Sequence, residues 1–360
     1  MNSEALTMSM YIVSSHEIKQ LAEALRASYD VYGPQVDPQT QQVFFDQLGD
    51  VEALNLEAPI PSMPVKEILF PQMERVLQYK YDAEAQSVEM SKPYAERPKV
   101  LFGLRPCDLS GILVLDRFFL GQEFVDDVYL THRRQCLLIS NTCLNPFPQC
   151  FCVCTHSGPD ADEGFDLDLT KLKDGYLVRV GSEKGQAIAD ERNWKPAQPH
   201  HLSEHKAVVD RCIDLFPEMA TDNKAWVSRV MNRITTGFIK SETWEYIGDQ
   251  CFECGACSFV CPTCSCFNVE DSRMCDGECE RLRTHDSCSF EGYARMAGDH
   301  NPRQPVEDRR NKRFFCKLSY PQSKKYLRPG CVGCGRCQWV CPGDIGLPNV
   351  VQYIRREITE

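Results

Sequence analysis

The stretch CFECGACSFVCP, residues 251–262, decides the fold of the C-terminal third of this 360-residue chain. The same spacing returns in CVGCGRCQWVCP, residues 331–342. Both stretches read C-x2-C-x2-C-x3-C-P. Three thiolates spaced in this way can wrap a loop around successive corners of a [4Fe–4S] cluster, while the fourth points at a second cluster. The repeated pattern therefore predicts two [4Fe–4S] clusters with crossed ligands.

The crossing defines two sets of ligands. We expect the first cluster on Cys251, Cys254, Cys257 and Cys341, and the second on Cys331, Cys334, Cys337 and Cys261. Gly255 and Gly335 lack a Cβ atom, so the backbone can approach inorganic sulfur closely there. Zinc ribbons also use C-x2-C pairs, but they need neither the fourth cysteine followed by proline nor its repetition. The spacing therefore favours iron–sulfur clusters over zinc.

Residues 262–330 separate the two cysteine stretches, which is too long for the small βαββαβ ferredoxin fold. We therefore expect a helical two-cluster domain with an inserted segment. Cys264, Cys266 and Cys288 in this insert are either ligands or buried apolar fillers, since free cysteine is mostly buried. Cys275 and Cys279 are expected in an exposed turn, and the isolated Cys212 and Cys316 in the core.

Residues 1–191 are expected to form a mixed α/β domain. Its predicted elements are a helix over His16–Ser28 capped by Ser14 or Ser15, a buried strand over Lys99–Leu104, a helix over Asp108–Phe119, a second buried strand over Cys136–Ser140, and a hairpin of 165–169 with 176–180. A polar, proline-containing linker is expected over 192–205, helices up to 248, and the two-cluster domain over 249–360. The predicted fold class is therefore α+β.

A second group of cysteines lies in the N-terminal part. Cys107 follows a predicted strand and opens a helix, and Cys143 follows another predicted strand. Strand ends of a parallel sheet lie side by side. Cys107 and the loop that carries Cys143, Cys150 and Cys152 can thus converge on a third [4Fe–4S] cluster, with Cys136 and Cys154 as spare thiols. The alternative is a set of unrelated cysteines.

Composition excludes several classes of function. The net charge of −11 argues against nucleic acid as a partner. There is no apolar run of about 18 residues for a membrane span, and the first residues lack a secretion signal. The 21 cysteines then indicate metal or redox chemistry in a reducing cytoplasm, in an anaerobic or microaerobic setting. No G-x-G-x-x-G or P-loop is present. The basic run 309–313 is expected to be a solvated face, and Lys66 a surface lysine.

The chain resembles the beta (iron–sulfur) subunit of soluble NiFe hydrogenases, also called sulfhydrogenases, and more distantly the electron-transfer subunit of anaerobic sulfite reductase. The resemblance rests on LFGLRPCDLSGILVLDRFF (101–119), CFC (150–152), GFDLDLTKLKDGYLVRVGSEKG (164–185), CFECGACSFVCPTCSCFNVED (251–271), DSCSFEGYARMAGDHNPR (286–303) and CVGCGRCQWVCPGDIG (331–346). Residues 164–185 favour the hydrogenase type. The resemblance also includes cysteines at 107, 143, 150 and 152.

The resemblance implies a non-catalytic electron-transfer subunit of an NAD(P)-linked oxidoreductase complex. Its partners would be a subunit that binds FAD and NAD(P), and the small and large NiFe hydrogenase subunits. One alternative is the corresponding subunit of a sulfite reductase-like complex. Alternatives of other classes are a stand-alone iron–sulfur enzyme with its own flavin, which an absorption spectrum would reveal, and a zinc-stabilised scaffold, which metal analysis would reveal.

Overall fold

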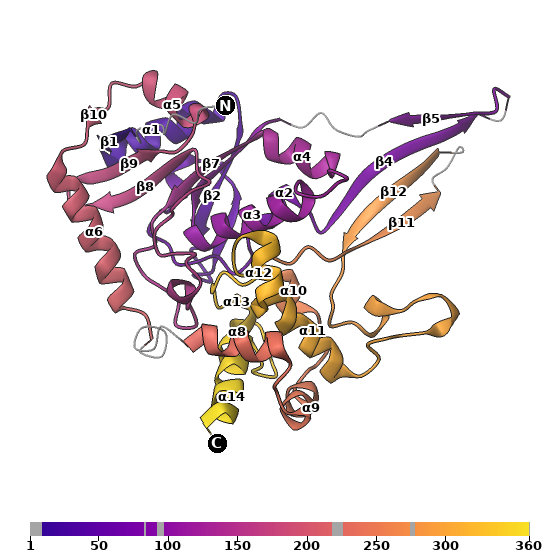
Figure 1. The fold of residues 1–360 in the computed structure, drawn as a ribbon. Helices are drawn as coiled ribbons and strands as arrows, with labels where there is room; N and C mark the ends of the chain where they lie inside the picture. Colours follow the sequence, from indigo (N-terminus) through magenta and orange to yellow (C-terminus); the bar gives the residue numbers. More distant parts are fainter. Residues whose placement is uncertain (1–8, 83, 92–96, 218–225, 274–277, 360) are drawn as a thin grey trace.

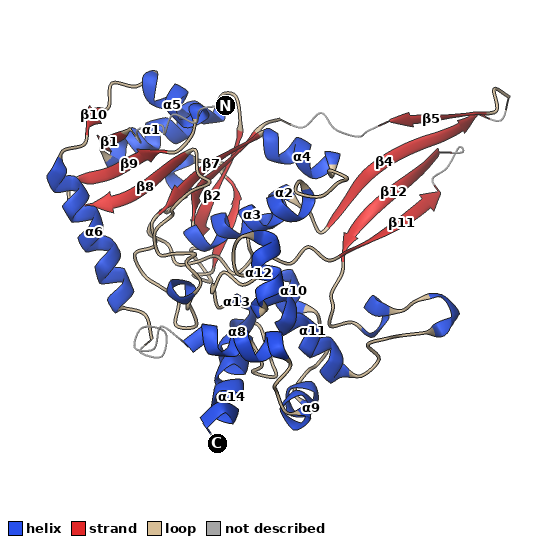
Figure 2. Cartoon of the chain, in the orientation of Figure 1, coloured by secondary structure: helices blue, strands red, loops and turns tan. Residues whose placement is uncertain are grey.

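A computed structural model describes residues 9–82, 84–91, 97–217, 226–273 and 278–359 (Figure 1). The strands form two separate sheets, and most of the C-terminal helices lie together below the larger sheet in Figure 2. The N-terminus lies beside the larger sheet, and the C-terminal helix ends at the opposite side of the molecule (Figure 1). The α+β class predicted from the sequence is confirmed.

The larger sheet has eight strands in the order β10-β1-β9-β8-β7-β6-β2-β3. Strands β2, β6, β7 and β8 pair in parallel at its centre, and the pairs toward both edges are antiparallel. The strands are β1 (Met10–Val13), β2 (Asp30–Val36), β3 (Val43–Gln47), β6 (Lys99–Leu104), β7 (Cys136–Asn141), β8 (Leu167–Leu172), β9 (Gly175–Val180) and β10 (Lys195–Pro196).

The central strands are apolar throughout because helices cover both faces of the sheet. In β6, Val100 and Phe102 pack in one cluster with residues of helix α1 (Ser15–Arg26), whereas Leu101 and Leu104 pack in another with residues of α3 (Pro106–Phe119). The helix predicted at 16–28 is confirmed, with Ser14 as its N-cap. The predicted strands at 99–104 and 136–140 and the hairpin β8–β9 are also confirmed.

The smaller sheet joins distant parts of the chain. Its order is β11-β12-β4-β5, with β4 (Met73–Asp82), β5 (Ser87–Ser91), β11 (Phe267–Arg273) and β12 (Glu278–His285), and all pairs are antiparallel. The insert between the cysteine stretches thus supplies a hairpin that pairs with an N-terminal strand, and the sheet extends to one side of the molecule (Figure 1). Cys279 is on β12 and half-buried, and Cys275 lies outside the described residues.

The remaining helices are mostly short. They are α2 (Lys66–Leu69), α4 (Asp127–Arg134), α5 (Glu183–Asp190), α6 (Pro199–Asp214), α8 (Trp226–Thr236), α9 (Ser241–Asp249), α10 (Ala256–Phe259), α11 (Val306–Leu318), α12 (Tyr320–Tyr326), α13 (Arg336–Trp339) and α14 (Leu347–Thr359). Single 3-10 turns cover Val51–Ala53, Cys152–Cys154, Glu291–Ala294 and Ala297–Asp299. Among the described residues, no helix is both long and apolar enough to cross a membrane.

The linker expected over 192–205 is wrong in its second half. Helix α6 already begins at Pro199, because proline has the backbone angle of a helix start and needs no partner for an N–H there. The expected domain boundaries at 191/192 and 248/249 stay predictions. Strand pairing between β4 and β12 joins residues on either side of both boundaries.

Candidate iron–sulfur sites

The two cysteine stretches adopt the same local structure. In each, the loop that carries the first cysteines runs into a four-residue helix, α10 or α13, and the fourth cysteine follows that helix. Gly255 and Gly335 precede these helices with φ of +75°, a conformation that glycine adopts without strain. A Cβ atom at Gly255 would lie 2.6 Å from the Phe290 ring, so the loop also has no room for a side chain.

The structure brings together both crossed sets of thiols. Cys341 of the second stretch lines one cavity with Cys251, Cys254 and Cys257 of the first. Conversely, Cys261 lies with the second stretch: burial, and then the Cys337 and Cys261 thiols, raise the pKa of Cys331 well above its usual range. Each fourth cysteine therefore lies with the stretch to which it does not belong in sequence.

The basic run 309–313 is not a solvated face, contrary to expectation. Arg309, Arg310 and Arg313 on α11 are each at most 3% exposed. Arg310 Nη1 lies 3.8 Å from Cys257 Sγ, and Arg313 Nη2 donates to the Cys257 carbonyl at 2.8 Å. Although burial raises the pKa of the Cys257 thiol, Arg313 and Arg310 bring it below its ordinary value. The reactive thiolate form, which binds metal, is thus favoured.

Two buried lysines surround the same region. Lys66, expected on the surface, is 2% exposed, and its Nζ donates to the carbonyls of Ser258 and Cys264 at 3.2 and 3.1 Å. Lys317 Nζ donates to Thr263 Oγ1 at 2.7 Å. In the described parts of the chain, neither lysine nor Arg313 forms an ion pair with a carboxylate. Buried cations are costly unless a negative charge offsets them, and here that charge comes from the cysteines.

These cations act on the ligand that crosses to the second set. A hydrogen bond from Cys264, and then Lys317, Arg313 and Lys66, hold the pKa of Cys261 well below its usual range despite burial. Cysteine binds metal as the thiolate, so the cations prepare this sulfur for a cluster. The arrangement fits a [4Fe–4S] cluster, whose hydrogen bonds and charge environment tune its potential.

The group of cysteines in the N-terminal part also converges, as predicted. Strands β6 and β7 are parallel neighbours, so Cys107 and Cys143 follow adjacent strand ends. Cys150 and Cys152 are buried, and the loop that carries them packs on the second stretch: Phe151 N donates to Gly333 O at 2.8 Å, and Cys150 Sγ lies 3.4 Å from Cys334 O. Cys107 is buried beside Val332 and Cys334.

Cys212 joins this group, which sequence reasoning missed. It is 1% exposed in the same cluster as Cys150 and Cys152. A hydrogen bond between the Cys143 and Cys212 thiols lowers the pKa of Cys143. Cys212 was expected to be an ordinary core residue, and no signal in its neighbouring sequence distinguishes it from one.

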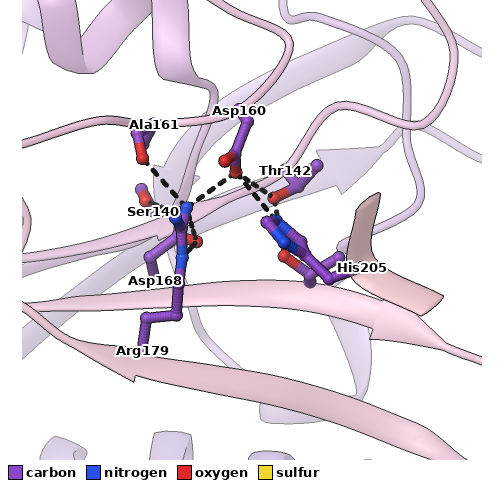
Figure 3. Close-up of polar contacts among 8 residues, drawn as sticks. Ser140, Thr142, Asp160, Ala161, Asp168, Arg179 and His205 are labelled. Atoms are coloured by element: carbon purple, nitrogen blue, oxygen red, sulfur yellow. Dashed lines mark hydrogen bonds and ion pairs between the residues drawn. The ribbon is translucent and has the colours of Figure 1, made fainter. Parts of the chain in front are cut away.

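A buried polar network explains how α6 places Cys212 (Figure 3). His205 on α6 lies 3.3 Å from Asp160 Oδ1, which also accepts from Arg179 at 2.7 Å and from Thr142 at 3.1 Å. Arg179 continues to Asp168, which is fully buried. The network therefore ties α6 to the residue next to Cys143. Seven residues separate His205 from Cys212, so both lie on one face of the helix.

None of these groups converges on a point where a single ion would sit. Across the described residues, no three His, Cys, Asp or Glu side chains are arranged to hold one metal ion. A [4Fe–4S] cluster instead takes one thiolate at each of its four irons.

Comparison with known proteins agrees with this geometry. Residues 250–345 match the family described as a 4Fe-4S dicluster domain. The sulfhydrogenase 2 subunit beta of Pyrococcus furiosus is 30% identical over 328 residues, which cover 90% of this chain and 92% of that relative. The chain belongs to the sulfhydrogenase beta-subunit family. For this family member, the predicted resemblance and the C-terminal two-cluster domain are confirmed. No solved structure matches the chain.

Proposed function

We propose that this chain is the iron–sulfur electron-transfer subunit of a hydrogenase-type complex. The observation that carries the proposal is the pair of crossed thiol sets enclosed by buried cations. When bound, [4Fe–4S] clusters accept and donate single electrons. The ligands we propose for them are Cys251, Cys254, Cys257 and Cys341 for the first, and Cys331, Cys334, Cys337 and Cys261 for the second.

The other residues of the chain support this chemistry without reacting themselves. Arg310, Arg313, Lys66 and Lys317 offset the negative charge of the clusters and favour the reduced forms. Gly255 lets the loop turn tightly around the first cluster. The exposed Cys254 places the edge of the first site at the protein surface, where an electron can pass to or from a partner.

A third [4Fe–4S] cluster on the thiols of Cys143, Cys150, Cys152 and one further cysteine would extend this electron path. Our sequence-based prediction gives Cys107 as the fourth ligand. The hydrogen bond between Cys143 and Cys212 supports Cys212 as an alternative fourth ligand. Either choice keeps the third site against the second stretch, because the loop 147–152 packs on Gly333 and Cys334.

The partners follow from the family. A beta subunit works beside other subunits, and we propose a flavoprotein subunit that binds FAD and NAD(P) on one side and a NiFe hydrogenase pair on the other. In this role the chain relays electrons and has no substrate of its own. The isolated chain should therefore be reduced by dithionite but should not oxidise NAD(P)H or H₂. Sustained turnover of either substrate by the pure chain would refute the proposal.

Iron analysis tests the third site. After strictly anaerobic reconstitution, the variant that loses the fourth ligand should lose about four irons while the ferredoxin-type signals stay intact. Comparing Cys107→Ser with Cys212→Ser identifies the ligand, and Cys150→Ser serves as the positive control. If all three variants retain the iron content of the parent chain, these cysteines are structural and the third cluster is refuted.

A further inference from the structure

Four cysteines of the insert line one cavity that belongs to none of the sites above. Cys264, Cys266, Cys288 and Cys316 come from three separate segments: the turn after the first stretch, the loop after β12, and helix α11. Sequence reasoning left the first three open and expected Cys316 in the core. Their convergence across more than fifty residues is a property of the fold.

The cavity is large enough to be compared with the first cluster site. Its volume is about 70 Å³, whereas the cavity lined by Cys251, Cys254, Cys257 and Cys341 measures about 20 Å³. Both are lined by four cysteines drawn from separate segments. The second of them lies within the matched 4Fe-4S dicluster domain, which makes it an internal standard for what a cluster site looks like in this chain.

The lining does not suit cysteines that merely fill a core. Val114 is the one aliphatic side chain among the described residues around the cavity, and the other lining side chains include Arg313, Lys317 and Tyr293. Tyr293 Oη donates to Cys266 Sγ at 3.2 Å, and Arg313 Nη1 lies 3.7 Å from Cys264 Sγ. Polar hydrogens that point at sulfur stabilise thiolates.

Cys136 shows the contrast. It is 1% exposed and packs among leucine and phenylalanine side chains between the large sheet and α3, where burial raises the pKa of its thiol to about 12. None of the four cavity cysteines belongs to a comparable apolar cluster among the described residues. The cation Lys317, also buried, faces their cavity and has a hydroxyl and a carbonyl of Thr263 as its hydrogen-bond acceptors.

We propose that this cavity holds a further [4Fe–4S] cluster, ligated by Cys264, Cys266, Cys288 and Cys316. Each thiol loses its proton as its sulfur binds one iron, and Lys317 and Arg313 offset the resulting negative charge. The site adjoins both ferredoxin-type sites, because Arg313 bridges the Cys257 carbonyl and the Cys264 thiol. It thus gives the electron path a branch that leads away from the third site.

The test compares iron, sulfide and zinc per chain in the full-length protein after anaerobic reconstitution. Cys288→Ser and Cys316→Ser should each lose about four irons and four sulfides, with the ferredoxin-type resonance signals unchanged. Cys136→Ser is the matched control and should keep the iron of the parent chain. Unchanged iron in both variants overturns the proposal, and so does the loss of one zinc in place of iron.

A second measurement covers the case in which the variants do not fold. In the parent chain, each cysteine is alkylated and identified by mass spectrometry with its clusters present and after iron removal. Cys266, Cys288 and Cys316 should be labelled only after removal, and Cys136 should react equally in both states. Equal labelling of the three in both states overturns the proposal. The third site is judged separately by Cys150→Ser, so the two hypotheses can fail independently.

Discussion

Replacing Arg310 with glutamine should lower the reduction potential of the first cluster. Arg310 is 2% exposed, and its Nη1 lies 3.8 Å from Cys257 Sγ. At an effective dielectric constant of about 20, a unit charge at that distance interacts by about 4 kcal/mol. For a one-electron couple this corresponds to about 170 mV, since 59 mV is a tenfold change in the equilibrium constant.

The expected shift is smaller than this upper bound because the added electron spreads over the cluster beyond the sulfur. We expect a decrease on the order of 80 mV, about half the contact value. Its sign follows from the loss of a cation that favours the more negative, reduced form. Glutamine keeps a polar group near Ser289 Oγ, to which Arg310 Nη2 donates at 2.6 Å.

The assay is an anaerobic redox titration followed by electron paramagnetic resonance. The control is Arg281→Gln, which removes a half-exposed arginine paired with Asp271 on the hairpin β11–β12 and should leave the potential unchanged. Iron content must match the parent chain in both variants. A potential within about 20 mV of the parent in Arg310→Gln, with full iron content, would contradict the charge-offset role.

Three further predictions concern local structure. Cys341→Ser should damage the cluster held by Cys251, Cys254 and Cys257 and spare the one beside it in sequence; resonance spectra that show the opposite would disprove crossed ligation. Gly255→Ala should cost more stability than Gly237→Ala in denaturant unfolding. Both glycines have positive φ, worth about 1 kcal/mol, but only Gly255 has neighbours within 4 Å of an added Cβ; equal losses would rule out crowding. His205→Ala should loosen α6 by roughly 1 kcal/mol and lower the iron content of the third site alone, and unchanged iron would separate the network from that site.

Much of the fold could be predicted because its signals are local. Lys99–Leu104 is apolar at every position after the first because both faces of the sheet are covered, and the KDG turn at 173–175 joins two alternating segments. The ferredoxin-type spacing is likewise contained in twelve residues. Pro199 shows the limit: proline and polar residues were taken for a linker, whereas proline at a first helical position begins a helix.

The unpredicted features depend on long-range contacts. Lys66 meets Cys264 from almost 200 residues away, and Cys212 meets Cys143 through a helix that the buried network holds. The buried arginines had a signal that a five-residue window does not show. Arg309, Arg313 and Lys317 recur every four residues, so they form one stripe along α11 that faces the cysteines.

The crossing of Cys341 and Cys261 has a consequence for the order of assembly. During synthesis, Cys251, Cys254 and Cys257 leave the ribosome some eighty residues before Cys341, and Cys261 about seventy before Cys331. Neither ferredoxin-type site is complete until almost the whole chain has emerged, and the insert must by then have paired β12 with β4. Cluster delivery is therefore a post-translational step onto a nearly finished fold, and a chain truncated before Cys341 would present two incomplete sites to the assembly machinery.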